Sequence, residues 1–165
     1  MEQHLEFDVK MKTMDMYKFL IYHTYSRFSG WFGVILSIVA IFMLVTGYDT
    51  LDDGGKLVLF VIGLLFTVVN PIMLLSKAQQ QIVGNAVYKK PLHYVLSEAG
   101  ITVSQEEQEE TMPWEQVCRM KQFRGELFVY TSKIHAFIFP FSQMGEAASE
   151  ITEYIAAHCS GGSVK

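Results

Sequence analysis

The sequence predicts an α+β membrane protein, in which a transmembrane helical hairpin is joined to an antiparallel β domain with a C-terminal helix. The chain has 165 residues, of which 50% are apolar and only 18% charged, against roughly 25% charged in a typical soluble domain. Two stretches, 28–48 and 57–76, contain no charged residue. After residue 91, short alternating stretches are separated by turn residues, which is typical of an antiparallel sheet.

The two apolar stretches predict a hairpin over residues 28–76, with spans at about 30–48 and 57–76. At ~1.5 Å rise per residue, about 20 residues cross the ~30 Å hydrocarbon core of a bilayer. The connector, residues 49–56, is so short that the two helices must run antiparallel. Two core helices of a soluble protein are the alternative, but the remaining chain is too small to enclose both.

Basic residues near the span ends predict that both termini face the cytoplasm. The connector carries only Lys56, whereas five basic residues flank the opposite ends of the spans: Lys18, Arg27, Lys77, Lys89 and Lys90. Cytoplasmic flanks of membrane spans carry an excess of Lys and Arg. We therefore expect the connector to lie outside the cell and the bulk of the chain to lie inside.

The pair Asn70-Pro71 is the irregular point of the second span. Pro71 has no N–H and its ring clashes with the carbonyl of Thr67, so we expect a kink. Asn70 is expected to lie at the depth of Ser37, and a contact between them would stabilise the helix pair by ~0.6–2 kcal/mol. The alternative role, lining a pathway, needs further polar residues and more than two helices.

The segments that flank the hairpin predict additional structure on the cytoplasmic side. Residues 1–27 contain an alternating strand pattern over 5–12, followed by a juxtamembrane helix over 15–27. Residues 77–90 are expected to continue the second span as a helical connector, which Pro91 ends because proline disfavours helix in the residue before it.

Residues 91–159 are predicted to form the β domain. A final helix over about 143–158, begun at Ser142, is expected to cover the sheet, and residues 160–165 are expected to be disordered. The strands are expected over residues 92–97, 101–104, 112–114, 117–123, 127–131 and 134–140.

Four motifs follow the spans: Leu-Ser-Glu-Ala-Gly-Ile (96–101), Pro-Trp-Glu-Gln-Val (113–117), Leu-Phe-Val-Tyr-Thr (127–131) and Ala-Phe-Ile-Phe-Pro (136–140). This order resembles the YcxB-like family of bacterial membrane proteins. The resemblance implies a pleckstrin-homology-like (PH-like) barrel at the inner face of a bacterial plasma membrane. Such a barrel has about seven strands and a capping helix, so we expect residues 5–12 to supply the strand that the C-terminal segment lacks.

One departure from the family concerns anionic headgroups. Members often carry a basic pair after the proline of the last strand, whereas Phe141-Ser142 follows Pro140 here. A headgroup contact through such a pair is therefore not expected in this chain.

The sequence lacks the motifs of a catalytic, cofactor or metal site. Its five histidines have no metal-ligand spacing, and no cofactor is predicted. Nucleic-acid binding is not expected either, since the net charge is −4 and no basic stripe is present. The densest charge is a predicted solvated hairpin tip over 105–110, a candidate interaction surface made of Glu106, Glu107, Glu109 and Glu110.

These observations favour an interaction or sensory module without catalysis, tethered to the lipid bilayer and binding a protein, peptide or headgroup, or a second copy of itself. One alternative is a small membrane enzyme, which would need three side chains to converge at the membrane junction: His23, His93 and Asn70. Another is a subunit of an oligomeric transporter, with close helix packing at Gly33, Gly47 and Gly63.

Overall fold

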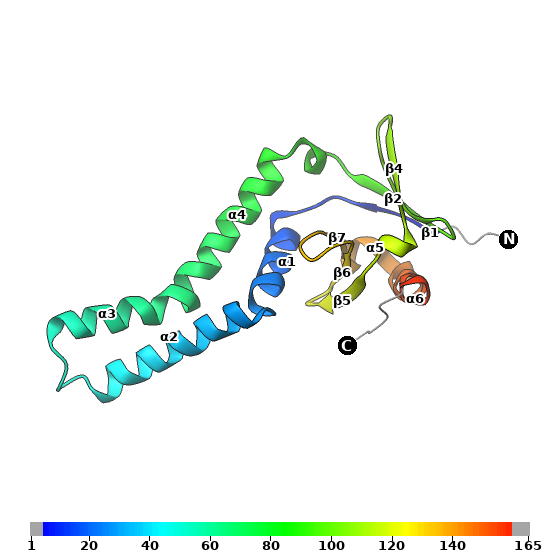
Figure 1. Ribbon diagram of the computed structural model, residues 1–165. Helices are drawn as coiled ribbons and strands as arrows, with labels where there is room; N and C mark the ends of the chain where they lie inside the picture. The colour runs from blue at the N-terminus through cyan, green and yellow to red at the C-terminus, as the bar shows by residue number, and fades with distance from the viewer. Residues whose placement is uncertain (1–4, 160–165) are drawn as a thin grey trace.

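The computed structural model describes residues 5–159 as a long helical hairpin joined to a β domain (Figure 1). One arm of the hairpin is α2 (Phe28–Thr46). The other arm consists of α3 (Asp53–Leu64), a π-helical turn (Leu65–Val69) and α4 (Asn70–Gly84). A short 3₁₀ turn at Ala86–Lys89 ends this arm, so the predicted connector is helical over most of its length. The predicted tail, residues 160–165, lies outside the described residues.

Both arms are long and apolar enough to cross a membrane. They contain 19 and 32 residues, and only 22% and 11% of their most apolar segments are buried. Large side chains such as Phe42 (65% exposed) and Leu57 (63% exposed) point away from the protein. Most of the surface of the two arms is therefore not covered by the described residues.

Glycines determine how closely the two arms approach each other. A Cβ atom added at Gly33 would collide with the Phe66 ring, and one added at Gly63 would lie 2.7 Å from Cγ1 of Ile41. These contacts set the register of the antiparallel pair, with residue 33 level with residue 66.

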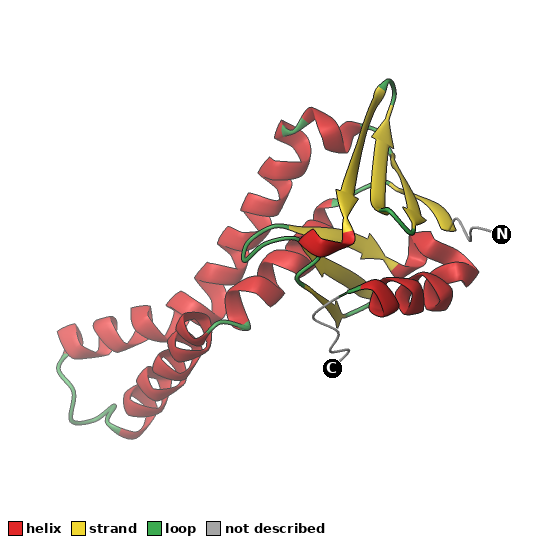
Figure 2. Cartoon of the chain, turned by 45° about the vertical axis from the view of Figure 1, so that its right-hand side comes forward, coloured by secondary structure: helices red, strands yellow, loops and turns green. Residues whose placement is uncertain are grey.

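Residues 5–159 contain seven strands in two antiparallel sheets (Figure 2). The first sheet has the order β1-β2-β3-β4 and the second has the order β5-β6-β7. The strands are β1 (Leu5–Val9), β2 (Leu92–Ser97), β3 (Gly100–Gln105), β4 (Gln108–Pro113), β5 (Arg119–Phe123), β6 (Glu126–Tyr130) and β7 (Ala136–Pro140).

The sheets do not close into the barrel that was expected. The chain leaves the first sheet after Pro113 through a 3₁₀ turn, Trp114–Gln116. The strand predicted over 112–114 therefore ends at Pro113, and the strand predicted over 117–123 begins at Arg119. The buried Trp114 indole donates to the carbonyl of Ser97 at 2.8 Å. This contact holds the turn against the end of β2, so β5 begins a separate sheet.

Strand β1 pairs antiparallel with β2, from Leu5 opposite Leu96 to Val9 opposite Leu92. The first strand therefore joins the C-terminal sheet, and the helical hairpin is inserted between two neighbouring strands. β1 ends at Val9 rather than at residue 12, because the next residue turns away. The Lys10 N–H donates to Oε1 of Gln143 at 2.7 Å.

Aromatic side chains fill the space between the two sheets. The Phe139 ring from β7 lies 5.0 Å from Phe7 and 4.9 Å from Tyr94, edge to face in both cases. Such pairs contribute about 0.5–1.5 kcal/mol beyond the area they bury. One face of the second sheet therefore packs on the first.

Helix α1 (Thr13–Tyr25) covers the other face of the second sheet. Its Phe19 ring lies 5.3 Å from Phe128 on β6, and its Tyr22 ring lies 5.2 Å from Phe123 on β5. The same helix packs against α4 and α2 (Figure 1). It is thus the element that connects the hairpin to the β domain.

The C-terminal helix is shorter than predicted. Residues after β7 form a single turn, α5 (Phe141–Met144), then a 3₁₀ turn at Gly145–Ala147, and only then α6 (Ala148–His158). Gly145 has φ of 60°, a backbone conformation that interrupts a helix, so a continuous helix from Ser142 was wrong. α6 buries Ile151 and Ile155 completely.

Candidate functional site

A cavity of about 1140 Å³ lies where the helical hairpin meets the β domain. Its walls come from α1, the end of α4, the first sheet and β7. The apolar part of its lining includes Met16, Phe19, Leu20, Leu92, Tyr94 and Ile138. Cavities that bind small molecules are mostly apolar and measure roughly 300–1,000 Å³, so this one is large enough for a ligand.

Polar groups also line the cavity, so it suits an amphipathic molecule. Amides come from Gln80 and Gln81 on α4 and from Gln108 on β4, and carboxylates come from Glu109 and Glu110. A ligand that places an apolar body on the aromatic and aliphatic wall can therefore direct polar groups toward these amides and carboxylates.

One wall of the cavity is held in place by Gln105 on β3. Its side-chain amide donates to the carbonyl of Val87 at 2.9 Å and to that of Lys90 at 3.1 Å. Both carbonyls belong to the segment that follows α4. The bonds therefore tie the end of the hairpin to the sheet beside the cavity.

His23 is the titratable ring that α1 contributes to the cavity lining. Burial lowers the pKa of His23, and the positive charges of Arg27 and Arg119 lower it further. Its ring packs 5.7 Å from Phe19. The neutral imidazole is thus favoured in the fold, and it offers either a donor or an acceptor to a bound molecule.

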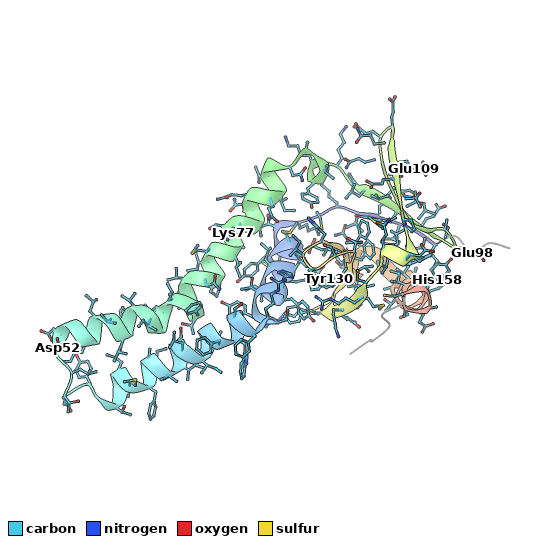
Figure 3. The ribbon with its side chains drawn as sticks, in the orientation of Figure 1. Asp52, Lys77, Glu98, Glu109, Tyr130 and His158 are labelled. Atoms are coloured by element: carbon cyan, nitrogen blue, oxygen red, sulfur yellow. The ribbon has the colours of Figure 1, made fainter. Side chains whose placement is uncertain are left out.

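The predicted acidic surface is divided by the structure. Glu106 and Glu107 form the turn, where Glu106 is ion-paired with Lys90. Glu109 and Glu110 are not part of the tip, as they lie in β4 opposite Ser104 and Val103. Figure 3 shows Glu109 on the hairpin that projects from the domain.

Asn70 and Ser37 do not pair with each other, contrary to the prediction. The Ser37 hydroxyl donates to the carbonyl of Ile62 at 2.9 Å, and the Asn70 amide donates to the hydroxyl of Tyr25 at 3.1 Å. The close contact of Gly33 with Phe66 places Asn70 beyond the level of Ser37, beside the corner between α1 and α2. Both residues join helices, but with different partners.

The irregularity expected at Pro71 is a π-helical turn that leaves one carbonyl without its helical donor, and Figure 1 shows the arm bending there. The Asn70 N–H donates to Leu65, five residues back. In that register the Phe66 carbonyl would be paired with Pro71, which has no N–H. The Tyr25 hydroxyl replaces the missing donor at 2.7 Å.

An ion pair with a buried carboxylate joins α1 to the second sheet, and no sequence pattern predicted it. Nζ of Lys18 lies 2.6 Å from Oε1 of Glu126, whose side chain is 1% exposed. Burial raises the pKa of Glu126, the nearby Asp15 carboxylate raises it further, and Lys18 opposes the rise. Glu126 follows a two-residue turn, so local sequence indicates only a solvated loop end.

The convergence required for the enzyme alternative is not observed. The Nδ1 atom of His93 lies 2.8 Å from Asp8 on the exposed face of the first sheet. His23 lines the cavity, and Asn70 contacts Tyr25. Within residues 5–159, no group of three His, Cys, Asp or Glu side chains is placed to hold a metal ion.

We expect Tyr25→Phe to destabilise the junction by about 1–3 kcal/mol, since the Phe66 carbonyl and the Asn70 amide lose a partly buried partner. Detergent-solubilised protein unfolded by heat would reveal this as a lower midpoint. Tyr48→Phe is the matched control, because the Tyr48 ring is 57% exposed. Equal midpoints for the two variants would contradict the assigned role of Tyr25.

We expect Glu126 to make the fold less stable as pH rises. The folded state holds the Glu126 proton more tightly than the unfolded state, because the pKa is raised above its ordinary 4.5. The stabilisation that Glu126 contributes is therefore fully present below pH 4.5. It is lost as the pH rises through the pKa that Glu126 has in the folded state. Glu126→Gln should reduce this loss, as measured by unfolding midpoints across the range. The exposed Glu146→Gln variant should keep the wild-type slope, and a wild-type slope in Glu126→Gln would refute the prediction.

Comparison with known proteins locates one family in the β domain. Residues 96–155 match the family model described as YcxB-like protein. Searches of curated proteins and of solved structures give no match to the chain. The matched segment contains all four motifs and extends from the end of β2 into α6. The resemblance is confirmed, and over residues 96–155 the chain carries a YcxB-like domain.

Proposed function

We propose that the chain is a membrane-anchored binding module of the bacterial plasma membrane. The helical hairpin crosses the bilayer, both termini lie in the cytoplasm, and the β domain is PH-like. The module binds an amphipathic ligand in the cavity between anchor and domain, without catalysing a reaction. The cavity is the observation that carries this proposal, because both parts of the molecule build its walls.

The exposed apolar surface of the hairpin supports membrane insertion. An apolar surface of this extent is covered by lipid or protein in stable molecules. Lys56 is the one basic residue in the connector, residues 49–56, whereas Arg27 and Lys77 flank the opposite ends of the arms. This bias supports the cytoplasmic placement of the β domain.

The strand count supports a PH-like domain. Four strands and three strands, followed by α6, correspond to the seven strands and capping helix that the family resemblance implies. The sheets remain separate at their edges, and the cavity opens between the first sheet, β7 and α1. The departure from a closed barrel is thus the feature that makes room for a ligand.

The shared walls also support a sensory role. Leu20 and His23 come from α1, Gln80 from α4, and Tyr94 from the first sheet. A ligand in the cavity touches the anchor and the domain at once. Its binding therefore strengthens the connection between them, which is how a signal from the ligand reaches the membrane part.

Topology is tested by cysteine labelling of intact cells with an impermeant maleimide. The exposed Cys118 is first replaced by serine. We expect Asp49→Cys, in the connector, to be labelled from outside, and Gln108→Cys to be labelled only after lysis. The reverse pattern would overturn the proposed orientation.

Ligand binding is tested by filling the cavity. Val103 lines it from β3, so Val103→Trp should displace a bound molecule that the wild-type protein retains when extracted from membranes. Native mass spectrometry measures the retained non-protein mass. Thr111→Trp, on the exposed strand β4 and outside the lining, should retain it. A wild-type protein with no bound molecule, or equal retention in both variants, would count against the proposal.

A further inference from the structure

Four basic residues belong to the elements that meet at the junction of the hairpin, α1 and the second sheet. Arg27 directly precedes α2, Arg119 and Lys121 lie on β5, and Arg124 is in the turn after it. Within residues 5–159, no carboxylate forms an ion pair with any of them, whereas Lys18, Lys56 and Lys90 all have acidic partners. Their charge is therefore available to an anion from outside the described chain.

Arg119 is exposed but held in position. Its guanidinium carbon lies 4.4 Å from the centre of the Tyr130 ring, which is its register partner on β6. Side chains alternate along a strand, so Lys121 is on the same face of β5. Arg119 is nevertheless exposed, and the planar fork of its guanidinium matches the oxygens of a phosphate.

Tyr130 connects Arg119 to helix α1. It is fully buried, the Arg119 guanidinium stacks on its ring, and the centre of the His23 ring of α1 lies 6.5 Å from that of Tyr130. Figure 3 shows Tyr130 close to α1. Arg27 follows His23 by four residues, about one helical turn, and the charges of Arg27 and Arg119 both lower the pKa of His23. The two guanidinium groups therefore share one corner of the molecule.

Arg27 brings the start of a helix to the same corner. It is the N-terminal cap residue of the 19-residue helix α2, and its side chain makes no capping bond. The first N–H groups of a helix are unpaired, and its N-terminus carries partial positive charge. Trp31 lies one turn further along and is 59% exposed, while Phe28 is 78% exposed.

We propose that Arg27 and Arg119, with Lys121 beside them, bind the phosphate of an anionic lipid headgroup in the inner leaflet. The inference rests on the proposed insertion of α2 into the bilayer. Arg27 then lies at the level of the headgroups, and the acyl chains extend along the exposed aromatic face of α2. A lipid is favoured over a soluble phosphate because the basic side chains lie beside exposed aromatic side chains of α2. Only a lipid offers both a phosphate for the first and acyl chains for the second.

The test uses the full chain in vesicles and the fluorescence of Trp31. Brominated lipids quench tryptophan on contact, and Trp114, the other tryptophan, is buried in the β domain and gives a constant background. Quenching by brominated phosphatidylglycerol is compared with quenching by brominated phosphatidylcholine at equal mole fraction. We expect about fivefold preference for the anionic lipid, the factor that about one basic residue contributes near such a surface.

The variant R27Q/R119Q should lose this preference and still be quenched by brominated phosphatidylcholine, which shows that insertion is intact. K77Q/K89Q removes the same charge from the other arm and should keep the preference. Equal quenching of the wild-type protein by both lipids, or an unchanged preference in R27Q/R119Q, would overturn the headgroup site. Either result would leave the proposed membrane insertion standing.

Two further outcomes separate this proposal from its alternatives. Loss of the preference on adding inorganic phosphate at constant ionic strength would assign the corner to a soluble phosphate and overturn the lipid. No quenching of Trp31 by either lipid would overturn membrane insertion itself, and the headgroup site with it. Retained preference in the presence of phosphate supports the lipid.

Discussion

The packing of α1 on two surfaces at once is the contact on which the rest of the structure depends. One side of the helix presents Phe19 and Tyr22 to the second sheet. The other side reaches the hairpin, where the Tyr25 hydroxyl satisfies the carbonyl left open by the π-helical turn. Since the hairpin is inserted between β1 and β2, α1 is also the first segment that leaves the sheet for the hairpin. Without its two interfaces, the anchor and the β domain would be joined only by flexible connections.

Both proposed binding regions lie beside α1, because this helix stands between the hairpin and the β domain. The cavity contains His23 and Leu20 from α1 and opens toward the projecting β3–β4 hairpin. The basic corner lies at the end of α1, where Arg27 directly precedes α2 and Arg119 stacks on Tyr130. A ligand in the cavity and a lipid at the corner would press on the same helix. This arrangement gives a physical route by which occupancy of one region affects the other.

The sequence predicted those features that depend on neighbouring residues. Uninterrupted apolar stretches indicated the two long helices. Alternation indicated a strand over 5–12, of which residues 5–9 form β1, and most strands of the C-terminal segment. Errors arose where a distant contact decided the conformation. Trp114 forms a 3₁₀ turn because its indole reaches Ser97. The break in the last helix is a local exception, because Gly145 adopts a positive φ there. Asn70 was matched to Ser37 by counting depth, but the Gly33–Phe66 contact shifts that register.

By itself, the sequence determined that this protein has two apolar helices, an antiparallel β segment and a YcxB-like domain, because periodicity, charge and short motifs are properties of adjacent residues. Only the tertiary structure decided that the sheets remain separate, that Lys18 pairs with a buried Glu126, and that a cavity forms beside α1. The ion pair and the cavity join residues more than a hundred positions apart in the chain. No local pattern records such a contact, since it exists only once β1 and α1 have packed against strands formed after the hairpin.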